Sequence, residues 1–244
     1  MKLFFPYKNP ENYYHFLIFM ISNLRHIDYE VIDEIYLEYI TNTPELLKNN
    51  PYILEILSYF FPNMQGCFLG EKPLDAIYLE YNPSTELSRG DPYSAESYIF
   101  LRNKLMPHIE QYKLPKIYDK IYISRDRASK RKIINEIFFQ EYLQSNGFHI
   151  LYLEDLTAIE QMAYFYHASV IISPHGAGLT NILFCNENVK IIEIATQYMT
   201  ELKHFSHIAE VLNLKYSRYT NVSCYTTDVD SNMLINFSGL DFSI

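Results

Sequence analysis

The sequence lacks the features that mark several large classes of protein. Only three of its 244 residues are cysteines, Cys67, Cys185 and Cys224, and their spacing matches neither a disulfide framework nor a zinc knuckle. The longest apolar run covers residues 16–21, far short of the ~20 residues that a membrane span needs. We therefore expect reduced thiols and no membrane span.

Signals for export and for binding polyanions are also missing. Residues 1–14 do not resemble a signal peptide, because their apolar part is short and Pro6 interrupts it. Lys and Arg number 20 against 29 Asp and Glu, a formal charge of −9, which argues against nucleic acid or an anionic membrane as the main partner. We expect a cytoplasmic protein.

Apolar residues make up 48% of the chain, enough to bury a core of one large domain or two small ones. In the second half, strands and helices alternate after a linker at residues 111–116. A helix with an apolar face ends at Asn146, and Thr157 and Glu160 form a capping box for the next. That face consists of Ile134, Ile137, Phe138 and Tyr142. The predicted strands are residues 120–125, 148–153, 169–173, 189–195 and 214–219.

The first half alternates less regularly. Its predicted strands are residues 2–7, 30–40 and 73–81, with helices at about 9–25, 44–60 and 95–108 and a loop at 82–94. Alternation of this kind is typical of parallel sheets covered by helices. We predict an α/β fold of two Rossmann-like lobes facing a cleft. Residues 1–116 form a reduced first lobe and residues 117–244 the second.

The segment SPHGAGLTN, residues 173–181, stands where a predicted strand ends and a helix begins. Gly176 and Gly178 allow a tight turn and leave no side chain to block a ligand. The N–H groups of the new helix favour an anion such as phosphate, and His175 at its mouth can donate a hydrogen bond. The alternative is an ordinary strand-to-helix turn that needs glycine for its geometry.

A basic cluster follows the strand at residues 120–125. It contains Arg125, Arg127, Lys130, Arg131 and Lys132 in an otherwise acidic chain. Arg125 lies at the carboxyl end of its strand, on the same edge of the sheet as His175, and arginine binds phosphate through two hydrogen bonds. The alternative is a solvated basic patch at a helix start.

These motifs together resemble glycosyltransferase family 61. The resemblance rests on YISR at 122–125 with Arg131 and Asn135-Glu136, on EQM at 160–162, on the SPHGAGLTN segment and on IIEI at 191–194. It covers residues 118–196 well. The first half contributes only Asn12 and His15, which resemble the family's N-x-x-H element.

The resemblance implies a GT-B-like fold and an inverting transfer from a UDP-sugar bound to the C-terminal lobe. It implies no cofactor and no metal, with a glycan or glycoprotein as acceptor. The diphosphate is expected between Arg125, Arg131, His175 and the backbone of Gly176, Ala177 and Gly178, with Ser124 and Asn181 as neighbours. Glu193 is expected to accept from a ribose hydroxyl, or else to be satisfied by a local amide. The loop from Leu153 through Glu154 to Leu156 is expected to hold the base. Gln161 is either part of the family element or a surface amide.

The acceptor side is less complete. His15 and His175 are the two candidate catalytic residues, and His15 is the candidate base. A lone histidine in an apolar helix is, however, often a core residue. The family usually carries Asp four residues later, where this chain has Phe19. Either another acid such as Glu11 or Asp91 serves, or the chemistry is altered or lost.

Two patterns suggest a metal only weakly. Asp228 and Asp230 spell the D-x-D of metal-dependent glycosyltransferases, but near the C-terminus we interpret them as a polar loop away from the donor cleft. His204 and His207 share a helix face without further ligands nearby. Two alternatives to a transferase remain: a degenerate relative that binds nucleotide or glycan without transfer, and a phosphatase that uses His175.

Overall fold

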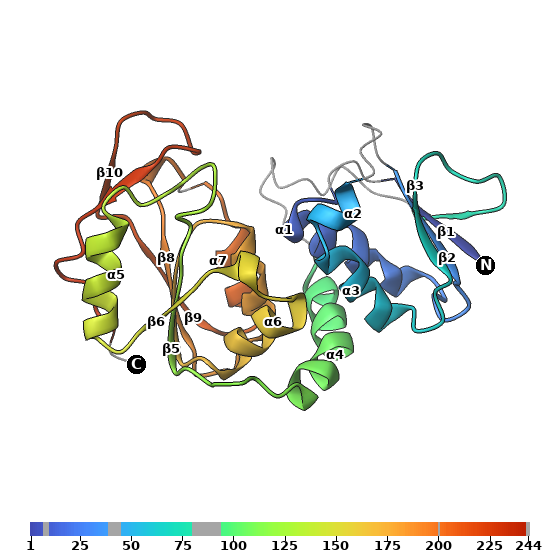
Figure 1. Ribbon diagram of the computed structural model, residues 1–244, viewed down its shortest axis with the longest axis horizontal. Helices are drawn as coiled ribbons and strands as arrows, with labels where there is room; N and C mark the ends of the chain where they lie inside the picture. Colours follow the sequence, from blue (N-terminus) through green and yellow to red (C-terminus); the bar gives the residue numbers. More distant parts are fainter. Residues whose placement is uncertain (7–9, 39–44, 80–93, 200, 243–244) are drawn as a thin grey trace. The chain divides into compact units, whose positions relative to one another are not determined.

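The computed structural model of the protein describes residues 1–6, 10–38, 45–79, 94–199 and 201–242. The chain forms two compact units, Met1–His108 and Ile109–Ile244. Each unit contains its own parallel sheet, so the prediction of an α/β fold with two Rossmann-like lobes is confirmed (Figure 1). Among the described residues, no helix combines the length and the apolar character needed to cross a membrane. All three cysteines are free thiols, as predicted.

The second unit is built on a five-stranded sheet in the order β6-β5-β7-β8-β9, with every neighbouring pair parallel. In this order β5 and β7 are neighbours at the centre of the sheet. The connection from β5 leads to β6 on one side, and the connection from β7 leads to β8 on the other. Such a point of reversal is where open α/β sheets bind ligands. The strands are β5 (Lys120–Ile123), β6 (His149–Leu151), β7 (Val170–Pro174), β8 (Lys190–Ile194) and β9 (Lys215–Tyr219).

Helices cover both faces of this sheet. Helix α5 (Glu136–Ser145) lies on one face, and α6 (Ala158–His167) and α7 (His204–Val211) lie on the other (Figure 1). The capping box predicted for α6 is present, with Thr157 and Glu160 each accepting a backbone N–H of the other. Three short 3-10 helices follow β6, β7 and β8: η5 (Leu153–Asp155), η6 (Ala177–Phe184) and η7 (Gln197–Met199).

The predicted apolar face of α5 is wrong except for Tyr142, which is partly buried against the core. Ile137 and Phe138 are 73% and 66% exposed, and Ile134 is exposed just before the helix. The buried face instead carries Phe139 and Leu143 together with Glu136. Glu136 faces inward because its carboxylate accepts hydrogen bonds from two buried hydroxyl groups of β5 and its carboxyl end. That polar contact determines which face of the helix is turned toward the sheet. Hydrophobic periodicity alone predicts a different face.

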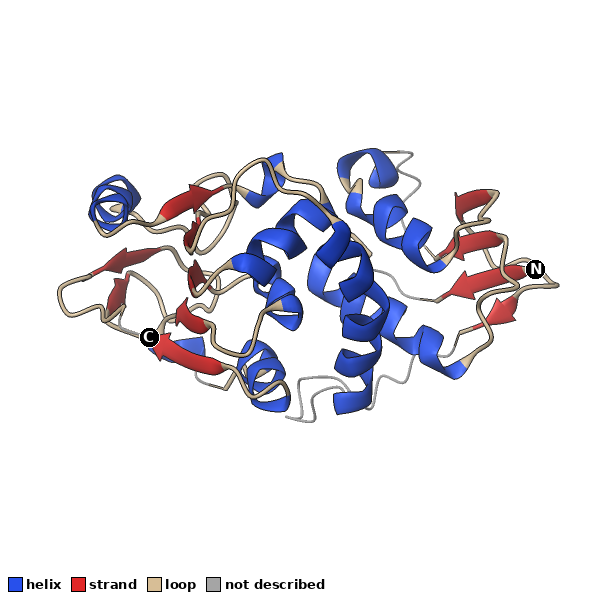
Figure 2. Ribbon diagram, turned by 90° about the horizontal axis from the view of Figure 1, so that it is seen from below, coloured by secondary structure: helices blue, strands red, loops and turns tan. Residues whose placement is uncertain are grey.

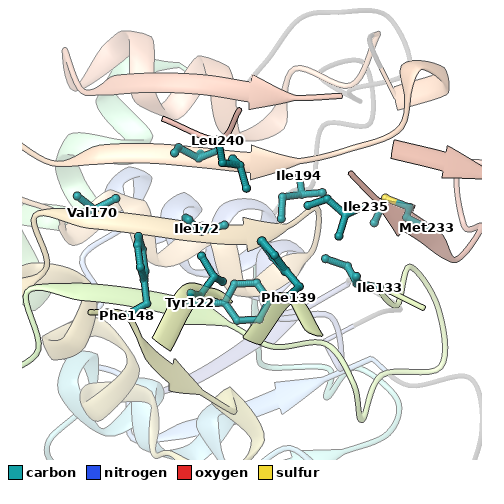
Figure 3. Close-up of a cluster of buried hydrophobic side chains, with 12 residues drawn as sticks. Tyr122, Ile133, Phe139, Phe148, Val170, Ile172, Ile194, Met233, Ile235 and Leu240 are labelled. Atoms are coloured by element: carbon teal, nitrogen blue, oxygen red, sulfur yellow. The ribbon is translucent and has the colours of Figure 1, made fainter. Parts of the chain in front are cut away.

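A C-terminal hairpin completes the core of this unit and was not predicted. Its antiparallel strands are β10 (Val222–Cys224) and β11 (Met233–Ile235). Met233 exchanges backbone hydrogen bonds of 2.7 Å with Lys132 and Ile134, and the Asn135 side chain both donates to and accepts from Ile235. Met233 and Ile235 thereby join the buried cluster around Tyr122 and Phe139 (Figure 3).

The first unit has a four-stranded parallel sheet in the order β3-β2-β1-β4, seen beside the N-terminus in Figure 2. Its strands are β1 (Lys2–Phe5), β2 (Glu34–Leu37), β3 (Gly66–Leu69) and β4 (Ile77–Tyr78). Strand β3 was not predicted, because a strand of four residues between turns shows too little alternation of apolar and polar side chains. An aromatic row crosses the sheet in register, Phe68-Tyr36-Phe4-Tyr78.

The helix predicted at residues 9–25 changes type along its length. Asn12 caps α1 (Tyr13–His15), which continues as the π-helix η1 (Phe16–Met20) and the 3-10 helix η2 (Ile21–His26). The remaining helices are α2 (Leu46–Asn49), α3 (Tyr52–Phe60) and α4 (Ala95–Gln111). The predicted loop at 82–94 and its Asp91 lie outside the described residues, apart from residue 94.

Candidate functional site

Arg125 and Gly176 meet at the carboxyl edge of the second sheet, where β5 and β7 end side by side. The Cζ atom of Arg125 lies 3.0 Å from the place that a β-carbon on residue 176 would occupy, and Nη1 lies closer still. Gly176 has an extended backbone with φ of 177°, which any residue adopts. Glycine is therefore required here to admit the guanidinium, and not for a left-handed turn.

The helix that follows Gly176 presents its N-terminus at the same edge. It is a 3-10 helix, and its first hydrogen bond runs from the Leu179 N–H to the Gly176 carbonyl at 2.9 Å. The N–H groups of Ala177 and Gly178 lie ahead of that bond, at the positive end of the helix. Arg125 and these two N–H groups thus provide positive charge and donors around one short turn.

His175 is held in place by a buried polar network. The ring is 4% exposed, and its Nδ1 pairs with Oε1 of Glu193, a neighbour on β8. The other oxygen of Glu193 accepts from the Tyr216 hydroxyl and, at 2.7 Å, from Nε of Arg218. Arg218 stands directly opposite Glu193 in the β8–β9 register. The predicted ribose ligand Glu193 is thus fully buried and engaged with three side chains.

Opposing effects set the protonation state of Glu193. Burial by itself raises the pKa of the carboxyl group, but the hydrogen bond and charge of His175, the charge of Arg218 and the hydrogen bond from Tyr216 outweigh it and lower the pKa below the ordinary 4.5. Burial and the Glu193 carboxylate raise the pKa of Tyr216. Glu193 is therefore ionised at neutral pH and orients the ring of His175.

Ser124 has a similar supporting environment. Its hydroxyl donates to Oε1 of Glu136 at 2.7 Å, and the hydroxyl of Tyr122 donates to the same oxygen at 2.8 Å. The Ser124 hydroxyl also accepts the backbone N–H of Asp126 at 3.2 Å. These contacts anchor the first turn after β5 and so determine the position of the Arg125 backbone.

Arg131 reaches the site through the C-terminal hairpin. Its backbone has a φ of 59°, in the left-handed region that is strained for a side-chain-bearing residue. Asp230 pairs with Lys130, lies 3.6 Å from Nε of Arg131, and accepts the Arg131 backbone N–H at 3.3 Å. The D-x-D pattern was interpreted as a polar loop away from the donor cleft, but Asp230 contacts Lys130 and Arg131, and Arg131 was predicted to belong to that cleft. The hairpin folds the loop back onto the basic cluster.

Two arginine side chains at this edge are incompletely hydrogen-bonded. Within the part of the chain that the structure describes, the Nε–H groups of Arg125 and Arg131 are buried and make no hydrogen bond, although Asp230 lies 3.6 Å from Nε of Arg131. Burial, followed by the charge of Arg131, lowers the pKa of Arg125. Because unsatisfied buried donors are costly, these two neighbouring cations make the edge a candidate site for an anion.

The turn η5 after β6 lies against the same site. The Cδ1 methyl of Leu153 fills the space that a side chain on Gly178 would take. At the tip of the turn Glu154 and Asp155 are exposed, and Asp155 pairs with Arg127. The Gln161 side chain contacts the turn and Asn181, which is fully buried on η6. The structure thus brings together the predicted residues Arg125, Arg131, Leu153, His175, Gly176, Ala177 and Gly178, with Ser124, Asn181 and Glu193 behind them.

His15 lies in an aromatic environment in the first unit. Its ring centre is 4.9 Å from that of Phe19 and 6.0 Å from that of Tyr14. Burial lowers the pKa of His15 from 6.5 to about 4, so the ring is neutral at pH 7. Of the alternative acids, Glu11 is exposed.

Metal ligands are not assembled in the described part of the chain, where no three His, Cys, Asp or Glu side chains are grouped to hold an ion. His207 lies 3.8 Å from Glu210, and the His204 ring is 6.0 Å from that of His175.

Sequence reasoning missed the residues that support the site. Tyr216 and Arg218 are two positions apart on β9, so they share a face, but their link to Glu193 depends on the pairing of β8 with β9. Glu136 is part of the N-E pair seen in the sequence, without any sign that it would be buried. Asp230 belongs to the D-x-D pattern, which was interpreted as a surface loop.

The family model described as Glycosyltransferase 61 matches residues 13–192, which includes parts of both units and the segments that carry Arg125, Arg131, Leu153 and His175 to Gly178. No curated protein matches the chain.

Proposed function

The chain belongs to glycosyltransferase family 61, and we propose that it transfers a sugar from a UDP-sugar to a hydroxyl group of a glycan or protein acceptor. In this proposal the second unit binds the nucleotide-sugar and the first unit binds the acceptor. The observation that carries it is the buried Nε–H group of Arg125, whose guanidinium lies against the Gly176 turn, with a second such group on the neighbouring Arg131.

We propose that the diphosphate binds between Arg125, Arg131 and the N–H groups of Ala177 and Gly178. An arginine and a helix N-terminus both stabilise phosphate oxygens, and here they converge on one strand edge. The positive charge of His175, when protonated, would add to theirs. The uracil base lies along the turn from Leu153 to Leu156, next to Gly178 in this arrangement.

The chemical step follows from this placement. The acceptor oxygen forms a bond to C1 of the sugar as the bond from C1 to the diphosphate oxygen breaks, so the configuration at C1 inverts. UDP leaves with the electron pair of the broken bond, and the arginines stabilise the negative charge that it gains. We propose that these cations serve in place of a metal ion.

The acceptor proton must also be removed. We propose that His15 receives it, because burial lowers the pKa of His15 to about 4 and leaves a neutral ring nitrogen to accept a proton at pH 7. His15 is a weak base at that pKa. If His15 is the base, the rate of transfer should fall as the pH approaches 4, where the ring becomes protonated.

Binding of UDP, GDP, CMP and ADP measured by calorimetry tests the donor site. Wild type should prefer UDP. Arg125→Ala should weaken UDP binding by about ten- to a hundredfold, since a charged hydrogen bond is worth about 1.5–3 kcal/mol. Lys215→Ala is the matched control, because Lys215 is exposed and begins β9, at the end of the sheet opposite to Arg125. Equal binding by wild type and Arg125→Ala would refute the site.

Release of UDP from a panel of UDP-sugars, with and without glycan acceptors, tests the transfer itself. One observation favours a second candidate function, a relative that binds nucleotide-sugar without transferring it. Phe19 packs 4.9 Å from His15 at the position where the family usually carries an acid. UDP-sugar binding without any acceptor-dependent release of UDP would support this alternative.

A further inference from the structure

The Gln161 side chain is inserted between two segments that follow different strands. Its Nε2 donates to the carbonyl of Leu153 at 2.9 Å and to that of Leu156 at 3.2 Å. Its Oε1 accepts from Nδ2 of Asn181 at 3.3 Å. One amide therefore ties both ends of the η5 turn to a buried residue of η6.

The η5 turn depends on such contacts because it has little apolar support. None of its three residues is buried. Leu153 rests over Gly178, and Arg127 pairs with Asp155 while its guanidinium lies 4.3 Å from the ring centre of Tyr152. Exposed turns of this kind usually have several conformations. This one is fixed by three separate groups. Leu153 and Gln161 both connect it to η6 beside the diphosphate site, Leu153 by apolar contact and Gln161 by hydrogen bonds.

The chemistry of the contact requires glutamine. Two carbonyl groups need two donors, and Asn181 needs an acceptor on the same short side chain, which a primary amide alone supplies. Glutamate at this position would bring negative charge towards two carbonyl oxygens. Methionine would keep the length and volume but make none of the three hydrogen bonds.

We propose that Gln161 is a positioning residue that sets the selectivity of the site for the nucleotide base. It holds the backbone of residues 153–156 in the one arrangement that matches uracil, at a fixed distance from the diphosphate donors. The inference rests on the proposed function, because it assigns a role within the donor site. It goes further by separating recognition of the base from recognition of the phosphates.

The test compares UDP, GDP and inorganic pyrophosphate as ligands for wild type, Gln161→Met and Gln161→Glu. Pyrophosphate reports the Arg125 site alone. We expect both variants to bind UDP about tenfold more weakly and to lose most of their preference over GDP. Pyrophosphate affinity should change by less than about twofold. Gln144→Met, an exposed glutamine on α5, is the matched control and should behave as wild type.

Each of the other possible results contradicts either the inference about Gln161 or the proposed donor site. If wild type prefers UDP and Gln161→Met keeps the same preference, the inference is wrong and the proposed function stands. If UDP and pyrophosphate weaken by the same factor, Gln161 is a structural residue and the positioning role is refuted. If wild type binds no nucleotide, the proposed donor site fails and the inference fails with it. Thermal unfolding of each variant verifies that a folded protein was measured.

Discussion

The guanidinium of Arg125 occupies the space that a side chain on Gly176 would need. These residues are far apart in the sequence and come from different strand ends, and each limits the other. Gly176 is glycine because Arg125 lies over it, and Arg125 is aimed at the turn because Gly176 leaves room. This relationship connects the two motifs by which the chain resembles its family.

The first prediction concerns this steric relationship. Gly176→Ala should displace the guanidinium and weaken UDP binding about tenfold, as loss of one charged hydrogen bond would. In an Arg125→Ala background the same change should have little further effect, because the overlapping group is gone. Calorimetry on the four proteins of this double-mutant cycle measures the coupling. Additive losses would contradict the steric explanation.

The second prediction concerns the buried network around Glu193. Glu193→Gln removes the charge that faces Arg218 and His175, and should reduce the free energy of unfolding by about 3 kcal/mol, as for other broken buried ion pairs. Glu210→Gln is the control. Its exposed side chain lies 3.8 Å from His207, and its loss should change stability by less than about 0.5 kcal/mol. Urea denaturation measures both.

The network also predicts a pH dependence. The pKa of Glu193 is lower in the folded protein than its ordinary 4.5. Its contribution to stability is therefore present above pH 4.5 and is lost as the pH falls through the lowered pKa. Unfolding curves should show a decline below about pH 4.5 that is shallower in Glu193→Gln. An identical decline in both proteins would argue that other groups cause it.

The third prediction concerns His15. Its pKa is lowered from 6.5 to about 4 by burial, so the unfolded chain binds the proton more strongly between these pH values. Stability should therefore decrease as the pH falls from 6.5 towards 4. Phe19→Asp places a carboxylate beside the ring and should raise the pKa of His15, whereas Phe19→Leu should not. NMR titration of the imidazole signals in the three proteins measures this.

The fourth prediction concerns Asp230, which would share Arg131 with the proposed diphosphate. Lys130 donates to Asp230, and this hydrogen bond, with the charges of Arg131 and Lys130, lowers the Asp230 pKa. Asp230→Asn removes negative charge near the anion and should strengthen UDP binding by about threefold, with a smaller effect at high salt. Asp228→Asn changes the same net charge two residues away and is the control. Weaker binding by Asp230→Asn would mean that Asp230 mainly orders Arg131.

Much of this protein is determined by its sequence alone. Alternating apolar segments predicted the strands of the second sheet, because buried parallel strands are short and hydrophobic. The capping box of α6 was evident, since its two residues interact within one turn. Arg125 was predicted to lie at the same sheet edge as His175 and Gly176, because parallel strands bring their carboxyl ends to one edge, and its guanidinium does lie against Gly176. Strand β3 and the C-terminal hairpin were missed, because each depends on pairing partners distant in the sequence.

The tertiary structure decided what surrounds these residues. The face that α5 buries follows from Glu136 bonding to Tyr122 and Ser124, and not from hydrophobic periodicity. Glu193 is engaged with Arg218 and Tyr216 because β8 pairs with β9, a register that no local pattern encodes. Asp230 reaches the basic cluster only because the hairpin packs on the core. Contacts between residues close in the sequence can be predicted from the sequence. Contacts with charged side chains from distant segments are decided by long-range packing.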